Sequence, residues 1–302
     1  MNTSPSADSL RSRRAGLLYG SFIAEALSLG VHWNYDPADI VRKHGQVVDF
    51  IAPGAGSYHP HKQAGDQGHV GDQALRLMAF LHREQHWHAP LFLADWVAMW
   101  PDYTDYVDKA TKATLANLAA GATLANSGST SDELAGPARI APLVAFKAEA
   151  DEEVLTTAAM EQTMVTHHSP HAIACAEFLA RLCRRLIEGA PLVPTLRALA
   201  PAWALAAADQ VLAAGTADPL GQLGRSCSMS AALPSVIYLV LKHDRDLAAA
   251  FIENAMAGGD NCARGLALGM ILGAANGVES IPARWMQGLR AAPAIEAFLA
   301  LR

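Results

Sequence analysis

Residues 253–285 read ENAMAGGDNCARGLALGMILGAANGVESIPARW, and this stretch decides the fold. Gly265, Gly269, Gly273 and Gly277 are spaced at every fourth residue, so they lie nearly in line on one face of a helix. Each glycine costs about 1 kcal/mol against alanine in a helix interior, and the close approach of a second helix would offset that cost. A membrane dimer uses the same spacing, but this run is shorter than the roughly 20 apolar residues of a span. The pattern therefore predicts a buried helix in an all-α protein.

The turn in front of this helix carries Gly258, Gly259 and Asp260. A helix N-terminus offers free backbone N–H groups that suit phosphate, and glycine lets the backbone approach a ligand closely. Asp260 has two interpretations, an acidic site residue at the mouth of the helix or a plain N-cap. Spacing alone favours the N-cap.

The composition of the whole chain is that of a helical protein with a sizeable core. The sequence has 302 residues, of which 51% are hydrophobic and 17% are charged. No run of alternating β-branched residues is long enough to predict a sheet. We expect a disordered leader at residues 1–14 and a single compact all-α domain at residues 15–302. The net charge of -6 argues against nucleic-acid binding through bulk charge.

The cysteines and the N-terminus bear on the location of the protein. The four cysteines show no CxxC pair and no zinc-like spacing, which is typical of free thiols in a reducing compartment. The N-terminus lacks the apolar run of a signal peptide. We therefore expect a cytoplasmic protein with no membrane partner.

Residues 15–29 form a second run of small and apolar residues. Gly16, Gly20 and Ala24 are again spaced at every fourth residue, so this helix can also pack closely against a neighbour. Glu25 places a charge in the middle of the run, and a buried carboxylate is costly unless it is paired or bound to a cation. The alternative is that its side chain reaches solvent at the helix end.

Residues 44–73 are polar, rich in glycine and without clear periodicity, which predicts a long loop of the kind that often carries function. His59, His61 and His69 lie close together in it, beside two GDQ triplets. Such a group of histidines and aspartates could bind a metal, although the spacing matches no metal motif. A solvated, hydrogen-bonded loop is the equal alternative. Asp72 precedes the next helical run and could be its N-cap.

Four segments taken together resemble the ADP-ribosylglycohydrolase family, which includes the dinitrogenase-reductase-activating glycohydrolases. In order, the family has a G-D-A-x-G-like helix followed by a glutamate, a T-D-D-T motif, a small-residue loop with an arginine before A-P, and G-G-D-T-D-T before a glycine-spaced helix. The matching residues here are Ala24–Ser28 with His32 nearby, Gly71–Ala74, Pro137–Pro142, and Gly258–Ala263 with Ile281, Pro282 and Trp285 downstream. The order and spacing hold over nearly the whole chain.

The resemblance implies an all-α hydrolase that binds two magnesium ions and cleaves ADP-ribose from protein side chains or related leaving groups. The family's metal ligands stand in the second and fourth motifs, where this sequence keeps Asp72 and Asp260. The other ligand positions are occupied by Gly71, Gln73, Cys262 and Ala263. Magnesium takes near-octahedral oxygen coordination. Two carboxylates can therefore hold one magnesium ion rather than two, and a site without magnesium stays open.

By this resemblance the catalytic candidates are Asp72 and Glu25, and the metal-ligand candidates are Asp72 and Asp260. The candidates for contact with a ligand are Gly258, Gly259, Asn261, His32, His69, Gln73 and Arg139. Purely structural roles remain open, namely N-caps for the two aspartates and a salt bridge for Arg139. We further expect Asp72 and Asp260 to converge on one cleft, with Glu25 approaching it and residues 65–73 at its rim.

The predicted function is metal-assisted hydrolysis of an ADP-ribosyl or related ribose-linked bond. The substrate would be a small molecule or a protein-linked group that resembles ADP-ribose. The alternative is a family member that has lost catalysis and binds an ADP-ribose-like ligand or a protein partner.

Overall fold

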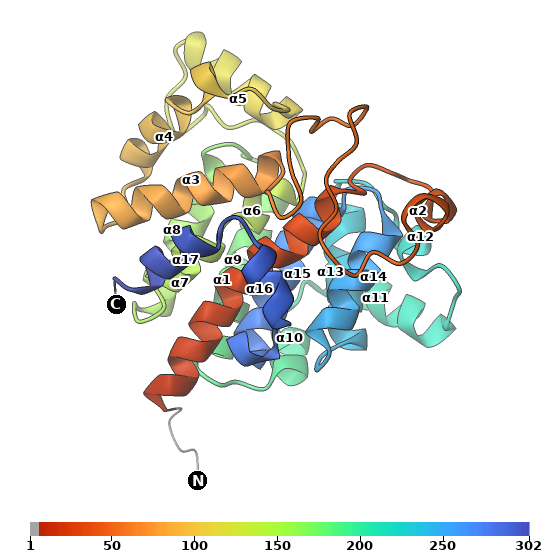
Figure 1. Ribbon diagram of the computed structural model, residues 1–302. Coiled ribbons are helices and arrows are strands. Elements are labelled where there is room, and N and C mark those ends of the chain that lie inside the picture. The colour runs from red at the N-terminus through yellow and green to blue at the C-terminus, as the bar shows by residue number, and fades with distance from the viewer. Residues whose placement is uncertain (1–5, 302) are drawn as a thin grey trace.

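The computed structural model describes residues 6–301, and every regular element within them is a helix (Figure 1). Extended pairing in this part of the chain is limited to two isolated bridges, Ser129 with His167 and Glu133 with Ser228. The predicted all-α class is confirmed. It follows from a sequence that is rich in alanine and leucine, which are strong helix formers.

Helices α1 (Ala7–Leu29) and α15 (Asn261–Asn276) lie side by side at the centre of the molecule and form its most extensive helix–helix contact (Figure 1). Helix α15 is buried without interruption from Asn261 to Ala274. A helix that is apolar or small on all sides belongs in the core of a protein rather than on its surface. The glycine-spaced run therefore forms the central helix, as predicted.

The glycines of these two helices face one another. A Cβ atom on Gly273 would clash with the carbonyl oxygen of Gly16, and a Cβ on Gly269 would clash with that of Gly20. A Cβ on Gly265 would lie 2.6 Å from the carbonyl oxygen of Ala24. The pairing is antiparallel, because higher numbers on one helix meet lower numbers on the other. The end of α1 therefore lies beside the start of α15.

The remaining helices surround this central pair. Before the middle of the chain they are α2 (Pro37–His44), α3 (His69–Glu84), α4 (Ala89–Val97), the 3-10 helix η1 (Trp100–Asp102) and α5 (Lys109–Ala119). Then follow α6 (Ala135–Ala138), α7 (Ala141–Phe146), α8 (Glu152–Met164), α9 (Pro170–Ile187), α10 (Leu192–Leu199), α11 (Ala202–Ala214) and α12 (Pro219–Leu223). The last are α13 (Met229–Lys242), α14 (Leu247–Ala257), the 3-10 helix η2 (Val278–Ser280), α16 (Ala283–Gly288) and α17 (Ala292–Leu299). Helices α9, α13 and α14 pack directly on α15, which makes it the hub of the core.

Residues 7–14 of the expected disordered leader are helical. Helix α1 already begins at Ala7, where the Ser6 side chain accepts a hydrogen bond from the N–H of Ser9. Arg13 then donates to the carbonyl oxygen of Leu186, which holds this first part of α1 against the protein. The cap and this contact explain the difference, because polar composition alone suggested disorder. Residues 1–5 lie outside the described part.

None of the helices within residues 6–301 combines the length and the apolar content that a membrane span requires. The cytoplasmic location stays a prediction.

Candidate functional site

The site lies where the end of α1 meets the start of α15. His32 follows α1 and points its ring at the first residues of α15. Its Nδ1 lies 3.0 Å from Oδ1 of Asn261, and its Nε2 lies 3.7 Å from Oδ1 of Asp260. The antiparallel packing of the two helices thus brings together His32, Asp260 and Asn261, which the sequence predicted as site residues.

Asp260 occupies the N-cap position of α15, but its side chain caps no backbone N–H. The side chain is 7% exposed and faces His32 instead. Burial raises the pKa of Asp260 to about 7, although the charge of Arg264 acts in the opposite direction. Asp260 is therefore at the N-cap position, as the N-cap interpretation predicted, but its side chain does not cap the helix.

The Gly258–Gly259 turn does not offer free donors. The N–H of Gly258 donates to the carbonyl oxygen of Ala255, and the N–H of Gly259 donates to that of Asn34 at 2.8 Å. Both glycines have φ near 65°, a left-handed conformation that glycine adopts without strain. These observations assign the turn to chain packing, and they weigh against the expected contact of its N–H groups with a phosphate.

Glu25 lies in α1 and is fully buried, so its side chain does not reach solvent at the helix end as the alternative required. Its Oε1 accepts a hydrogen bond of 2.8 Å from the N–H of Gly68, whereas Oε2 has no hydrogen-bond partner. Burial, reinforced by the nearby charge of Asp72, raises the pKa of Glu25 to about 8. Glu25 therefore carries a proton at neutral pH.

Asp72 lies inside the first turn of α3 rather than at its N-cap, which is Gly68. Its Oδ2 accepts hydrogen bonds of 2.6 Å from both the Lys62 ammonium and the Tyr103 hydroxyl. Helix α3 starts at His69, so the last residues of the predicted loop are already helical. Asp72 also lines a cavity of about 500 Å³ between α3 and α17.

The two candidate metal ligands have different partners. Asp72 is held by Lys62 and Tyr103, and Asp260 faces His32. Lys62 also lies 3.8 Å from Asp105, which in turn contacts a histidine of the site. The two aspartates thus flank one group of polar side chains, but their expected joint binding of one ion stays a prediction.

His59, in the loop before α3, and His69, the first residue of α3, supply the rest of the site. The side chains of His59 and His69 are 2% and 5% exposed, whereas His61 is exposed. The ring centroids of His59 and His69 lie 5.3 Å apart, and that of His32 lies 5.8 and 6.2 Å from them. The solvated-loop interpretation is therefore wrong for two of the three loop histidines. They form a buried cluster with His32.

An aromatic cover lies over the histidines. The Trp33 ring centroid lies 4.2 Å from that of His32 and 5.4 Å from that of His69. Trp33 has a φ of 60°, which is uncommon for a large side chain and is typical of functional sites. Its N–H donates to the carbonyl oxygen of Gly259, so the cover is fixed to the turn before α15.

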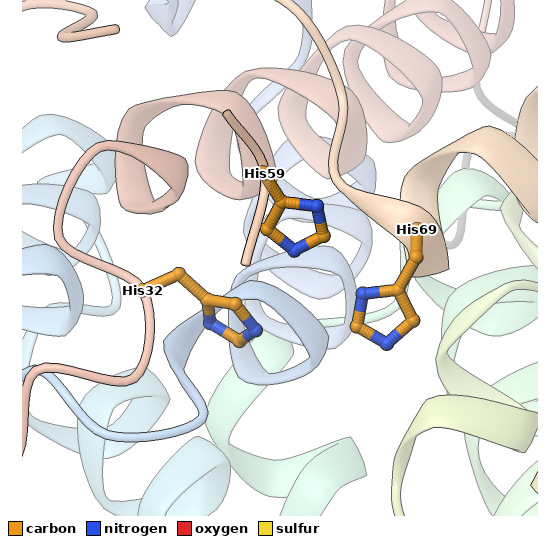
Figure 2. A group of neighbouring side chains, drawn as sticks. All are labelled: His32, His59 and His69. Atoms are coloured by element: carbon orange, nitrogen blue, oxygen red, sulfur yellow. The ribbon is translucent and has the colours of Figure 1, made fainter. Parts of the chain in front are cut away.

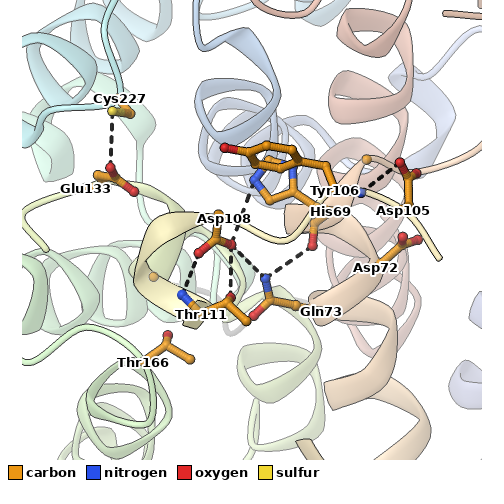
Figure 3. A network of polar contacts seen from close by, with 12 residues as sticks. His69, Asp72, Gln73, Asp105, Tyr106, Asp108, Thr111, Glu133, Thr166 and Cys227 are labelled. Carbon is orange, nitrogen blue, oxygen red and sulfur yellow. Dashed lines mark hydrogen bonds and ion pairs between the residues drawn. The ribbon is translucent and has the colours of Figure 1, made fainter. Parts of the chain in front are cut away.

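Gln73 and Arg139 contact each other in a buried polar network, and Figure 3 shows the contact of Gln73 with Asp108 in it. The side-chain oxygen of Gln73 accepts hydrogen bonds from Arg139 and, at 2.9 Å, from the Trp96 indole. Its amide donates to Asp108 at 3.3 Å. Both predicted ligand-contact residues are thus occupied within the protein, and Arg139 binds neutral oxygens of Gln73 and Thr166 rather than the expected carboxylate partner.

A cavity of about 580 Å³ opens beside His32 and Trp33. Pockets of this size accommodate small-molecule ligands. Its other lining residues include Asn34, Tyr35, Lys43 and Tyr58. The histidine cluster therefore lies next to a space in which a ligand could bind.

Comparison with known proteins now decides the family. The family model described as ADP-ribosylglycohydrolase matches residues 6–302. The chain belongs to the ADP-ribosylglycohydrolase family. A solved structure described as an ADP-ribosylglycohydrolase-related protein complex shares the fold, with a TM-score of 0.74 and 22% identity, over 97% of this chain and 98% of that chain. No curated protein matches the sequence.

The residues at this family member's metal motifs fit magnesium poorly. Gln73 already accepts two hydrogen bonds, and the Lys62 ammonium lies against Asp72 where a cation would bind. Within residues 6–301, one group of three or more potential ligands gathers its ligand atoms within 4.8 Å, and its members are His32, His59 and His69. Magnesium prefers oxygen to nitrogen.

Sequence reasoning missed the acidic residues that support the cluster. Asp105 lies 3.2 Å from Nδ1 of His59, and Asp108 lies 3.8 Å from Nε2 of His69. The available signal was the spacing of Asp102, Asp105 and Asp108 in front of a helix. Asp108 is the N-cap of α5, and this spacing alone gives no reason to connect the acidic residues with the histidines.

Proposed function

We propose that this chain hydrolyses a bond at the anomeric carbon of an ADP-ribosyl or related ribose-linked substrate. The observation that carries this proposal is the approach of His32 to Asp260 where α1 ends and α15 begins, together with the cavity beside His32. Glu25, a fully buried carboxyl of α1, is added to this pair as the candidate acid. Membership of the ADP-ribosylglycohydrolase family supports the same reaction class. Lys43 lines the cavity, where its ammonium pairs with Asp39 at 2.7 Å.

In this hydrolysis the bond from the anomeric carbon to nitrogen or oxygen breaks, and a bond to the oxygen of water forms. The leaving group needs a proton, and the attacking water loses one. Glu25, whose pKa burial and the charge of Asp72 raise to about 8, is assigned as the acid. Asp260, whose pKa burial raises to about 7 against the charge of Arg264, is assigned as the base. Asp72 acts through Glu25, because its charge helps to raise that pKa.

A specific observation favours a second candidate, a member that binds an ADP-ribose-like ligand or a protein partner without cleavage. The Lys62 ammonium neutralises Asp72 at 2.6 Å, and Gly71, Cys262 and Ala263 offer no carboxylate at the other motif positions. Such replacements remove the charge with which the family's usual site attracts cations.

The test is the release of ADP-ribose from mono-ADP-ribosylated peptides linked through arginine or serine. We expect release by the wild type with a maximum between about pH 7 and pH 8, because the base must be ionised and the acid protonated. Glu25→Gln keeps the side-chain shape but cannot donate the proton, and we expect a loss of about 10²–10⁴-fold. Glu188→Gln, on the exposed end of α9, is the matched control.

Calorimetry with ADP-ribose separates the two candidates. Saturable binding without release by the wild type would support the binding member and contradict the hydrolase. Neither binding nor release would contradict both proposals for this cavity.

A further inference from the structure

Three buried histidines each leave one ring nitrogen without a hydrogen-bond partner. These atoms are Nε2 of His32, Nε2 of His59 and Nδ1 of His69. The side chains are 1%, 2% and 5% exposed, and each contributes a ligand atom to a group whose members lie within 4.8 Å of one another. In Figure 2 the three rings surround a common space, and a nitrogen of each ring faces it. A buried nitrogen without a partner is costly, so three facing the same space call for an explanation.

The opposite nitrogen of each ring faces an oxygen. His32 Nδ1 lies 3.0 Å from Oδ1 of Asn261, and His59 Nδ1 lies 3.2 Å from Oδ1 of Asp105. His69 Nε2 lies 3.8 Å from Oδ2 of Asp108, a contact that Figure 3 also draws. The hydrogen bonds of His32 and His59 place the N–H on the outer nitrogen of each ring, and the nearby Asp108 carboxylate favours the same tautomer of His69, which leaves a lone pair on each inner nitrogen. Metal-binding histidines have this arrangement, with the second ring nitrogen held by a carboxylate or carbonyl oxygen.

We propose that His32, His59 and His69 bind a divalent transition-metal ion, with Zn²⁺ as the reference case. Imidazole nitrogen suits zinc, copper, iron and nickel, whereas magnesium and calcium prefer oxygen. Two nitrogens bound at about 2.0–2.1 Å to a tetrahedral zinc ion lie about 3.4 Å apart. The rings therefore need to close by only a fraction of an ångström each. The three histidines are not themselves part of the carboxylate motifs, and the proposal does not depend on the proposed substrate.

The site has three protein ligands and room for a fourth. The Asp260 carboxylate, 3.7 Å from Nε2 of His32, lies beside the ion's position and faces it from the start of α15. Zinc sites with three protein ligands and an open position are the catalytic type, whereas structural sites have four. Trp33 and Tyr106 cover the cluster, with ring centroids 5.4 and 5.1 Å from that of His69. The cover limits the access of water to the ion.

The charge state of the histidines agrees with this role. Burial, followed by the neighbouring imidazoles, holds the pKa of His32 and His69 well below the usual value. Burial also lowers the pKa of His59, against the effect of Asp105. A histidine binds metal in its neutral form, and these three rings are neutral at physiological pH.

The experiment is a Co²⁺ titration of the full chain after treatment with a chelator, followed by visible absorption. Bound Co²⁺ reports nitrogen ligation and a low coordination number without any substrate, so failure of this proposal is distinguishable from failure of the proposed hydrolysis. We expect one Co²⁺ per chain, displacement by one equivalent of Zn²⁺, and no displacement by a large excess of Mg²⁺. Binding to several weak sites, or displacement by Mg²⁺, would overturn the proposal.

The matched variants are His59→Ala and His61→Ala, because the two histidines lie in the same loop but only His59 is in the cluster. We expect His59→Ala and His69→Ala to lose tight Co²⁺ binding and His61→Ala to keep it. Equal loss in His61→Ala would refute the assignment. Should a cluster variant melt early, His59→Gln is measured by thermal shift. Zn²⁺ must then raise the melting temperature of the wild type but not of His59→Gln, and an equal rise in both refutes the site.

Discussion

The α1–α15 interface and the histidine cluster adjoin each other, yet they were accessible to sequence reasoning to very different degrees. The interface depends on small residues at every fourth position of two helices, a pattern that each helix shows by itself. The cluster takes His32, His59 and His69 from three segments, and its supporting oxygens come from two more. A contact made by a repeated pattern can be predicted from one helix, but a contact among single residues requires the path of the whole chain.

The first prediction tests the interface side of this comparison and has the largest expected effect. Gly269→Leu places a side chain against the backbone of Gly20, where even a Cβ would clash. We expect a loss of at least about 3 kcal/mol, above the typical range for overpacking, because backbone rather than a flexible side chain must move. Urea unfolding followed by circular dichroism measures it.

Gly54→Leu is the control, because a Cβ at Gly54 meets nothing within 4 Å. Equal urea midpoints for the two variants would show that α1 and α15 separate easily to accept a large side chain. The close packing of this interface would then be contradicted.

The second prediction concerns Glu25, which lies in α1 where the interface passes into the site. Its pKa is raised to about 8, so the folded protein binds this proton more tightly than the unfolded chain does. The contribution of Glu25 to stability is therefore full at pH 4 and is lost as the pH rises towards 8. Glu25→Gln should be more stable than the wild type at pH 9 by on the order of 3–5 kcal/mol, with little difference at pH 4.

Urea midpoints from pH 4 to pH 9, on protein treated with a chelator, give the result. The exposed Glu188→Gln should follow the wild type throughout. A wild type and a Glu25→Gln variant with parallel pH profiles would mean that the Glu25 carboxyl is hydrated and ionised in the folded protein.

The third prediction concerns the support of the cluster. Asp105→Ala removes the oxygen that faces Nδ1 of His59 at 3.2 Å, and we expect Co²⁺ affinity to fall by about 10–100-fold. Asp102→Ala, in the exposed η1 turn, should keep the wild-type affinity. The melting temperature of the metal-free protein separates a positioning role from a structural one. An affinity loss shared by both variants would argue against a specific role for Asp105.

The smallest effect is expected for the pair of Lys62 and Asp72. Its 2.6 Å contact is partly exposed, and we expect a coupling energy of about 1 kcal/mol in a double-mutant cycle of Lys62→Met and Asp72→Asn. A coupling energy of zero would show that Lys62 does not stabilise the Asp72 carboxylate. Asp72 would then return as a candidate cation ligand, and the contrast between the nitrogen cluster and the carboxylate motifs would weaken.

The outcome at individual residues shows where sequence reasoning stopped. Asp260 and Asn261 were predicted as site residues from a sequence motif, and both face His32. The prediction was possible because the start of a helix can be located from the local sequence. The sequence could not distinguish the buried His59 from the exposed His61, because loop residues carry no local pattern that indicates which side chain is buried. Gln73 was chosen as an oxygen donor, but its oxygen is already used by Arg139 and Trp96, partners that lie far from it in sequence.

The sequence by itself determined the helical class, the presence of a closely packing face on α1 and on α15, and the family, because each depends on patterns that repeat or keep their order along the chain. Only the tertiary structure decided which polar atoms remain without partners. Hydrogen bonds and burial depend on neighbours from distant segments of the chain. Two residues that are close together in a loop can therefore differ, one with a buried polar group and the other with a solvated one. The three inner nitrogens of His32, His59 and His69 therefore became visible only when the chain was folded.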